Sequence, residues 1–317
     1  MDKKLKISII VPVHNATTTL ERCLDSIIGQ SYQNVECILI ENGSTDDSLV
    51  RCNFYAEKYA CIKVAVSEEG VSKARNLGLS LATGDVIGFC DADDFYETEA
   101  FSIIVDCFTK NPHIVGVISA FNIGNENEAG IQREYNGINK KCVYAQEAMI
   151  LTLADDNVMG SVWNRFYRSD VAKKIQFDTR LSYCEDTHYN IKLLSSIENA
   201  KLAYIPKPLY CYMMNRDSVT HQLDRLYNQD GELKYISVLK KIVGECNLSN
   251  KCLSITKMRI TVLAIDYLYY GQANNLQRSK LKENIKQNIW YFFRNITSFG
   301  FFQNLKRVGK LLLSWWR

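Results

Sequence analysis

Residues 85–94 read DVIGFCDADD, a short apolar run followed at once by three carboxylates. The apolar run predicts a strand buried in a sheet, so Asp91, Asp93 and Asp94 would crowd its carboxyl end. Carboxylates this close repel one another unless a cation lies among them, and oxygen-only ligands suit Mg²⁺ or Mn²⁺. A solvated acidic turn, with Asp94 capping the next helix, is the simpler alternative. The position directly after a strand favours the cation site.

The residues before this run alternate between strand and helix patterns. The expected strands cover residues 5–13, 35–40, 61–66 and 85–90, with helices between them that include 20–28, a segment from 46, and 71–81. This alternation predicts an α/β fold with a mostly parallel central sheet. Ligands bind such sheets beyond the carboxyl ends of the strands. Those ends carry polar groups here, at 12–15 (PVHN), 41–44 (ENGS) and 91–94 (DADD).

The second half of the chain has a weaker pattern that becomes helical. The expected elements are a strand at 114–121, a loop at 122–141, helices at 145–154 and 187–197, and a strand or hairpin at 201–213. After about residue 224 the pattern predicts only helices, from 233–242 through 253–270 to the end. We therefore expect an α/β domain over residues 1–220 and an α-helical extension over 221–317.

Composition limits the possible partners and the compartment. The net charge of +3 over 317 residues is too small to indicate nucleic acid. No pair among the eleven cysteines has the C-x-x-C spacing, which predicts free thiols in a reducing compartment. The first residues give neither a signal peptide nor a membrane span, so a cytoplasmic location is expected.

Four segments occur in an order and spacing that resemble glycosyltransferase family 2, whose members have the GT-A fold. They are 9–15 (IIVPVHN), 41–46 (ENGSTD), 74–76 (ARN) and 91–94 (DADD). Each is weak alone, but four in register are specific. The resemblance is strong over residues 5–100 and moderate to about 220. It implies a nucleotide-sugar half over 1–110 and an acceptor half over 111–220, in the style of bacterial capsule, O-antigen and exopolysaccharide transferases.

The resemblance also implies a nucleotide-sugar site, made of Pro12, Val13, Glu41, Asn42, Arg75, Asp91, Ala92 and Arg216. In it Asp93 would ligate Mn²⁺ or Mg²⁺ against the diphosphate, and Asp91 would contact the ribose or sugar. The family commonly has two aspartates where this chain has Glu41 and Asn42. A carboxylate there would accept the N3–H of uracil, whereas an asparagine can accept or donate. UDP is the expected nucleotide.

Residues 183–186 (YCED) begin a helix, and in similar proteins an acidic pair here presents the catalytic base. Asp186 is the expected base, with Glu185 as the alternative. An acceptor hydroxyl is a poor nucleophile until a positioned carboxylate takes its proton. Opposite a diphosphate neutralised by a metal ion, such a base favours a single in-line displacement with inversion. An acidic pair that only complements the helix dipole is the other interpretation.

Two further segments match the family on the acceptor and donor sides. Trp163 could stack on an acceptor sugar, although core tryptophans are commoner. Arg216 and His221 follow a strand, and similar segments close over the donor near its diphosphate. An ordinary surface loop is the alternative.

The end of the chain is basic and aromatic. Residues 290–317 hold five basic residues and no acidic one. On a helix, Leu305, Val308, Leu312 and Trp315 would share one face, the profile of an interfacial helix on an anionic membrane leaflet. A terminal helix packed on the catalytic domain is the alternative.

Together these features predict an inverting transferase that moves a hexose or N-acetylhexosamine from a nucleotide-diphospho-sugar. The acceptor would be a glycan or a lipid-linked oligosaccharide in surface polysaccharide assembly, at the cytoplasmic face of the inner membrane. A dehydrogenase is disfavoured, because no G-x-G-x-x-G follows the first strand. A catalytically silent nucleotide-sugar binder or scaffold with the same fold is the remaining alternative.

Overall fold

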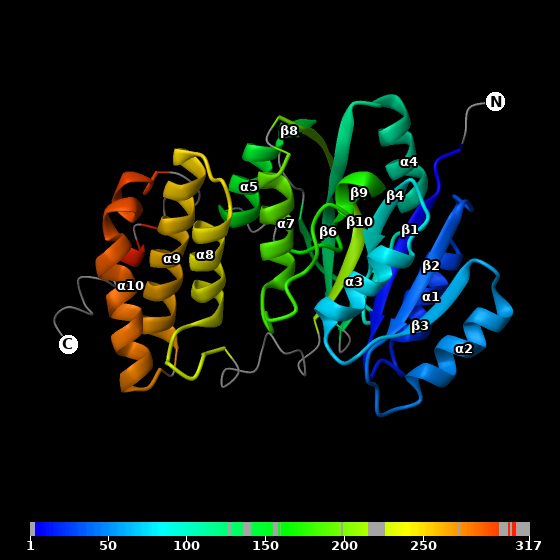
Figure 1. Cartoon of the computed structure of the whole chain (residues 1–317), viewed down its shortest axis with the longest axis horizontal. Coiled ribbons are helices and arrows are strands. Elements are labelled where there is room, and N and C mark those ends of the chain that lie inside the picture. Colours follow the sequence, from blue (N-terminus) through cyan, green and yellow to red (C-terminus); the bar gives the residue numbers. More distant parts are fainter. Residues whose placement is uncertain are drawn as a thin grey trace.

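A single sheet crosses most of the molecule, and a group of helices forms one end (Figure 1). The structure is a computed structural model, and it describes residues 4–125, 128–135, 141–154, 158, 160–197, 199–214, 226–271, 273–297, 304 and 306–308.

The sheet has ten strands in the order β3-β2-β1-β4-β9-β6-β10-β5, with β7 beside β6 and β8 beside β10. The strands are β1 (Ile7–Val13), β2 (Val35–Glu41), β3 (Ile62–Val66), β4 (Val86–Phe89), β5 (Phe95–Tyr96), β6 (Ile114–Asn125), β7 (Glu128–Tyr135), β8 (Cys142–Tyr144), β9 (Arg165–Arg168) and β10 (Lys201–Met214).

Strand direction differs between the two halves of the sheet. The four strands β3-β2-β1-β4 are all parallel, as the alternation with helices predicts, and β6 is parallel to β10. Antiparallel pairing enters where β9 lies between β4 and β6, and at β5, β7 and β8. The carboxyl ends of β1, β2 and β4 therefore meet at one edge of the sheet.

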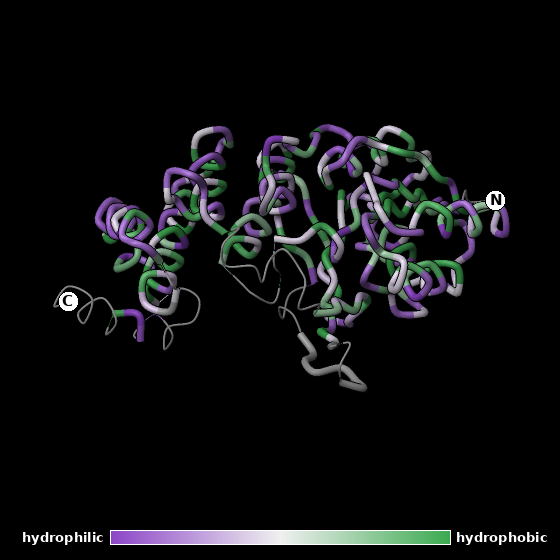
Figure 2. Tube along the Cα trace, turned by 90° about the horizontal axis from the view of Figure 1, so that it is seen from below, coloured by the Kyte–Doolittle hydropathy of each residue, from purple (hydrophilic) through white to green (hydrophobic). Residues whose placement is uncertain are grey.

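The helices are α1 (Leu20–Ile28), α2 (Ser48–Lys58), α3 (Val71–Leu81), α4 (Ala100–Lys110), α5 (Ala145–Ala154), α6 (Ser169–Ala172), α7 (Glu185–Ser195), α8 (Lys234–Glu245), α9 (Asn250–Tyr270) and α10 (Asn275–Arg294). Two hydrophobic cores lie on opposite faces of the sheet, because successive residues of a strand point to opposite sides. Ile9 and Val11 pack toward α1, α2 and α4, while Ile10 packs toward α3. Figure 2 shows hydrophilic and hydrophobic segments interspersed along the chain at both ends of the molecule.

Two expectations about single elements were wrong, and a third was resolved between its two alternatives. Residues 122–141 were expected to form a loop, but β6 continues to Asn125 and pairs with β7. Of the strand or hairpin expected at 201–213, the structure has the strand, and register shifts around Pro208 accommodate the missing backbone donor. The helix expected from Asp46 begins at Ser48, because the Asp46 carboxylate accepts from the Ser48 amide.

The C-terminal helices α8, α9 and α10 continue the core that α5 and α7 form on the sheet. The expected boundary at residue 220 falls within 215–225, outside the described residues. Of the expected tail helix, Arg307 pairs with Asp266 of α9 at 2.7 Å, and Val308 packs against the core. This described part of the tail lies on α9, within the extension itself. None of the helices in the described ranges is long and apolar enough to cross a membrane.

Candidate functional site

A cleft of about 610 Å³ opens at the carboxyl ends of β1, β2 and β4. Its lining residues come from four separate segments, namely Pro12, His14, Asn15, Ala16, Thr18, Thr19, Asn42, Glu69, Gly70, Val71, Asp91, Ala92 and Asp93. The cleft thus gathers four of the residues expected to bind a nucleotide sugar and the expected metal ligand, namely Pro12, Asn42, Asp91, Ala92 and Asp93. Parallel strands bring these ends together although the chain separates them.

Glu41 and Asn42 at the end of β2 are buried and already bonded to backbone. The Asn42 Nδ2 donates to the Val13 carbonyl at 3.1 Å, and its Oδ1 accepts from the Gly70 amide at 3.3 Å. The Glu41 carboxylate accepts from the Ser44 amide. Gly70 has φ of +127°, a conformation that few other residues adopt. Asn42 therefore braces the cleft between β1 and α3, with part of its hydrogen-bonding capacity left for a ligand.

The three carboxylates after β4 have separate surroundings. Asp91 and Asp93 line the cleft, and the Asp93 carbonyl accepts from Arg22 at 2.5 Å. Asp94 is fully buried, where it accepts from the Tyr210 hydroxyl at 2.7 Å and from the Met213 amide at 2.7 Å. Burial raises the pKa of Asp94 well above its usual range, and the charges of Asp93 and Asp91 add to this. Asp94 anchors the turn to β10 and caps no helix, since α4 begins at Ala100.

Arg75 joins the two halves of the site. Its side chain is only 5% exposed, and it donates to Asp91 at 3.0 Å and to Glu185 at 2.6 Å. Burial lowers the pKa of Arg75, because a low-dielectric environment disfavours the charged form. The negative charges of Asp91, Glu185 and Asp186 outweigh this effect, so the pKa of Arg75 is raised. The guanidinium also lies over the Phe177 ring, 5.5 Å from its centre. Arg75 was expected in the nucleotide-sugar site, and its contacts in the described structure are these two carboxylates and the Phe177 ring.

The acidic pair at the start of α7 faces this arginine. Cys184 precedes it with φ of +53°, a strained conformation for cysteine that sets the direction of the helix start. Asp186 accepts from the Thr187 amide at 2.7 Å. Burial, followed by the charge of Glu185, raises the pKa of Asp186 to about 7, while Arg75 opposes the rise. A carboxylate with a pKa near neutrality suits proton abstraction at neutral pH.

The residues expected on the acceptor side and over the donor are not part of the described site. Trp163 is 4% exposed and stacks on Tyr210 and Tyr212, with ring centres 4.6 and 5.7 Å away. Its role is therefore in the core, the alternative already open for it, because no face is available to a sugar. Arg216 and His221 lie outside the described residues.

A divalent ion would have oxygen donors in the cleft. The described ranges contain no cluster of three or more His, Cys, Asp or Glu side chains able to enclose a metal by themselves. Asp93 borders the cleft, and Asp91 has one oxygen bonded to Arg75. Mg²⁺ characteristically takes one or two carboxylates and completes its shell with phosphate and water. The residues present fit an ion that binds together with a diphosphate.

Sequence reasoning missed several residues that build this site. Arg22, Tyr210 and Phe177 contact Asp93, Asp94 and Arg75 respectively, from distant parts of the chain. Tyr210 lies in an apolar strand and Phe177 in a connection, so no local pattern marks them. Glu69 could have been found, because it directly precedes the glycine before α3.

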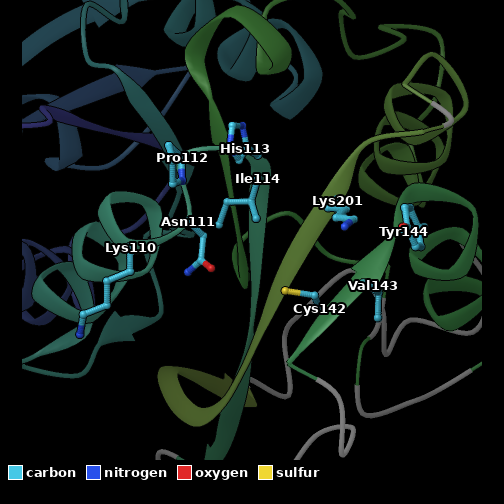
Figure 3. Close-up of a pocket in the computed structure, with 9 residues that line it drawn as sticks. All are labelled: Lys110, Asn111, Pro112, His113, Ile114, Cys142, Val143, Tyr144 and Lys201. Carbon is cyan, nitrogen blue, oxygen red and sulfur yellow. The ribbon is translucent and has the colours of Figure 1, made fainter.

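A second cavity, of about 380 Å³, lies far from these groups (Figure 3). It is lined by residues from the end of α4, the start of β6, β8 and Lys201. Since Ile114 and Lys201 begin their strands, this cavity is at the opposite edge of the sheet. It holds none of the expected site residues.

Comparisons with known proteins identify the fold and the family of the chain. Glycosyltransferase GlyA of Streptococcus pneumoniae serotype 4 is 29% identical over 222 residues, which are 68% of this chain and 31% of GlyA. The chain thus spans about a third of that relative. S. aureus TarS 1–349 in complex with UDP-GlcNAc superposes with a TM-score of 0.67 at 17% identity, covering 91% of this chain and 82% of TarS 1–349. Mannosyltransferase PcManGT from Pyrobaculum calidifontis, in complex with GDP-Man and Mn²⁺, superposes with a TM-score of 0.53 at 14% identity. The match covers 99% of this chain and 88% of PcManGT.

These structural matches establish the GT-A-like fold. The model of the family described as Glycosyl transferase family 2 matches residues 8–176, more than half of the 317 residues. The chain belongs to glycosyltransferase family 2.

Proposed function

We propose that this protein transfers a hexose or N-acetylhexosamine from a nucleotide-diphospho-sugar to an acceptor hydroxyl, with inversion at the anomeric carbon. The observation that carries the proposal is the double contact of Arg75. It ties Asp91, which borders the donor cleft, to Glu185, which adjoins the base Asp186. A single guanidinium group therefore bridges a residue of the proposed donor site and the residue next to the proposed base.

In the proposed reaction, Asp186 accepts the proton of the acceptor hydroxyl. The hydroxyl oxygen forms a bond to the anomeric carbon of the donor while the bond from that carbon to the diphosphate oxygen breaks. The nucleoside diphosphate leaves with the electron pair, and one displacement inverts the configuration. Asp186 can accept this proton at neutral pH because its pKa is raised to about 7. Arg75 holds Glu185, the neighbour of Asp186, next to Asp91 at the cleft.

Asp93, together with Asp91, would hold Mn²⁺ or Mg²⁺ at the cleft. A bound divalent ion would stabilise the charge that develops on the leaving diphosphate. The Mn²⁺ in the PcManGT complex supports this choice of ion.

UDP is the proposed nucleotide of the donor. The UDP-GlcNAc in the TarS complex supports this choice. The remaining hydrogen-bonding capacity of Asn42 supports it too, with Pro12 and Val13 placed beside the uracil ring in the proposal. The proposed acceptor is a glycan or lipid-linked oligosaccharide of surface polysaccharide assembly, reached at the cytoplasmic face of the membrane.

The test uses the whole chain with a panel of nucleotide sugars and Mn²⁺. We expect a UDP-sugar to raise the thermal midpoint and to be turned over in the presence of acceptor glycans. Asp186→Asn should keep donor binding and lose at least about a hundredfold in kcat, the usual contribution of a general base. Asp93→Asn should weaken the metal-dependent part of donor binding. Asp170→Asn, an exposed aspartate on α6, is the control.

Two results would overturn the proposal. If donor binds but Asp186→Asn transfers sugar as fast as the wild type, Asp186 is not the base. If the wild type binds donor and transfers to no acceptor in the panel, the silent binder is the better description.

A further inference from the structure

The outer face of α10 combines exposed aromatic and basic side chains. Trp290 is 71% exposed and Phe293 47% exposed, an unusual state for such large apolar groups. Lys282, Lys286 and Arg294 are exposed as well. Steps of three and four residues place all five on one side of the helix. We refer to these five residues as the basic-aromatic face.

The charge of α10 is concentrated and largely uncompensated. The helix holds five basic residues and a single acid, Glu283, so it carries more positive charge than the net +3 of the whole chain. Lys282, Lys286 and Arg294 form no ion pair with any carboxylate in the described part of the chain. Residues 290–317, which begin within this helix, contain no acid at all.

Packing does not explain the exposed aromatics. The inner side of α10 is already filled by Leu281, Ile285 and Phe292, which are buried against the core that includes α9. In Figures 1 and 2 the helix lies at the outer end of the molecule. The described start of the tail, with Arg307 bonded to Asp266, packs on α9 and does not account for the outer face.

We propose that the basic-aromatic face binds the surface of an anionic lipid bilayer. Tryptophan prefers the headgroup region, and neighbouring cations are attracted to anionic headgroups. A symmetric contact with a second copy would set the same cations against one another, so charge favours the bilayer. The proposal places the contact on α10, on residues other than those in the helix expected at 305–315, and it does not depend on catalytic activity.

The experiment is flotation of the full chain with vesicles of phosphatidylcholine alone or with a quarter phosphatidylglycerol. Two variants test the face, Trp290→Ser/Phe293→Ser and Lys282→Gln/Lys286→Gln/Arg294→Gln. The control Val50→Ser/Phe54→Ser removes equally exposed apolar groups from α2, where they are 67% and 59% exposed. All replaced side chains are on the surface, and circular dichroism checks that each variant folds.

We expect the wild type and the control to bind only the anionic vesicles, and less so at high salt. Each lysine or arginine near the surface contributes roughly fivefold in affinity, so the triple variant should lose more than about tenfold. The aromatic variant should lose at least about tenfold too. Equal binding by wild type and variants, or no binding by the wild type, would overturn the proposal. So would a wild-type dimer in light scattering that the aromatic variant abolishes, because the face would then join two copies.

Discussion

Arg75 is the residue on which the geometry of the site depends most. It is a buried cation with two carboxylate partners, Asp91 at the cleft and Glu185 at the start of α7. A planar guanidinium can bond both at once, whereas the compact ammonium of lysine offers no such fork. Its charge and that of Glu185 act in opposite directions on the pKa of Asp186.

This opposition predicts opposite shifts in the pH dependence of transfer. In the wild type, kcat/KM should fall as the pH drops below about 7, because protonated Asp186 cannot accept a proton. Glu185→Gln removes a charge that raises the pKa, so the acid limb should move to lower pH. Arg75→Gln removes a charge that lowers it, so the limb should move to higher pH. The measurement is kcat/KM from pH 5 to 9, and shifts in the same direction would contradict the assignment of the base.

Tyr210 gives a second prediction at this scale. Its hydroxyl donates to Asp94 and accepts from the Asp91 amide at 3.1 Å, so it fixes the turn that carries Asp91 and Asp93. Tyr210→Phe leaves the buried Asp94 with one partner fewer, which should cost about 1–3 kcal/mol in the free energy of unfolding. It should also raise KM for the donor more than it lowers kcat. Tyr55→Phe is the control and should leave KM unchanged, because its hydroxyl bonds Asp25 and neither residue lines the cleft.

Among the elements, α3 determines where Arg75 lies. The helix packs directly on β1 through Gly78, where an added Cβ would be 2.3 Å from the Cγ2 of Ile10. Arg75 is three residues before Gly78 on the same helix, so any displacement of α3 moves the guanidinium. Close packing of helix on strand is thus a condition for the double contact with Asp91 and Glu185.

Gly78→Ala should therefore destabilise the protein and impair transfer together. We expect a loss of about 1–3 kcal/mol in the free energy of unfolding, typical of an overpacked core. Gly244→Ala in α8 is the matched control, since an added Cβ there meets nothing within 4 Å. That change should be neutral or stabilise by up to about 1 kcal/mol. Denaturant titration measures both, and equal effects of the two variants would refute the packing argument.

At the scale of the whole molecule, the C-terminal helices are part of the structural support of Asp186, the proposed base. One hydrophobic core runs from the sheet through α5 and α7 into α8, α9 and α10. His188, two residues after Asp186, contacts Glu245 of α8 at 3.2 Å. The helix that carries Asp186 is therefore held between the sheet and the extension.

Removing residues 226–317 should thus unfold more than the extension. The apolar sides of α5 and α7 would face water, and hydrophobic burial is the main favourable term in folding. We expect the shortened chain to lack a cooperative thermal transition in circular dichroism. A cooperative transition within a few degrees of that of the full chain would show that the sheet and its own helices suffice.

The sequence alone determined the α/β class, the family and five of the residues that line the cleft. Buried parallel strands are continuous apolar runs, and polar residues directly after them mark one edge of the sheet. These are local signals, so DVIGFCDADD and its neighbours could be interpreted without any coordinates. The helical character of the extension followed from periodicity in the same way.

Only the tertiary structure decided what each of those residues contacts. Asp91, Asp93 and Asp94 look equivalent in sequence, yet one bonds Arg75, one borders the cleft and one is buried against Tyr210. Trp163 was assigned to the acceptor side and lies in the core, because Tyr210 and Tyr212 of the distant strand β10 cover it. Such contacts join residues far apart in the chain, and hydrophobic periodicity carries no record of which partners the packing selects.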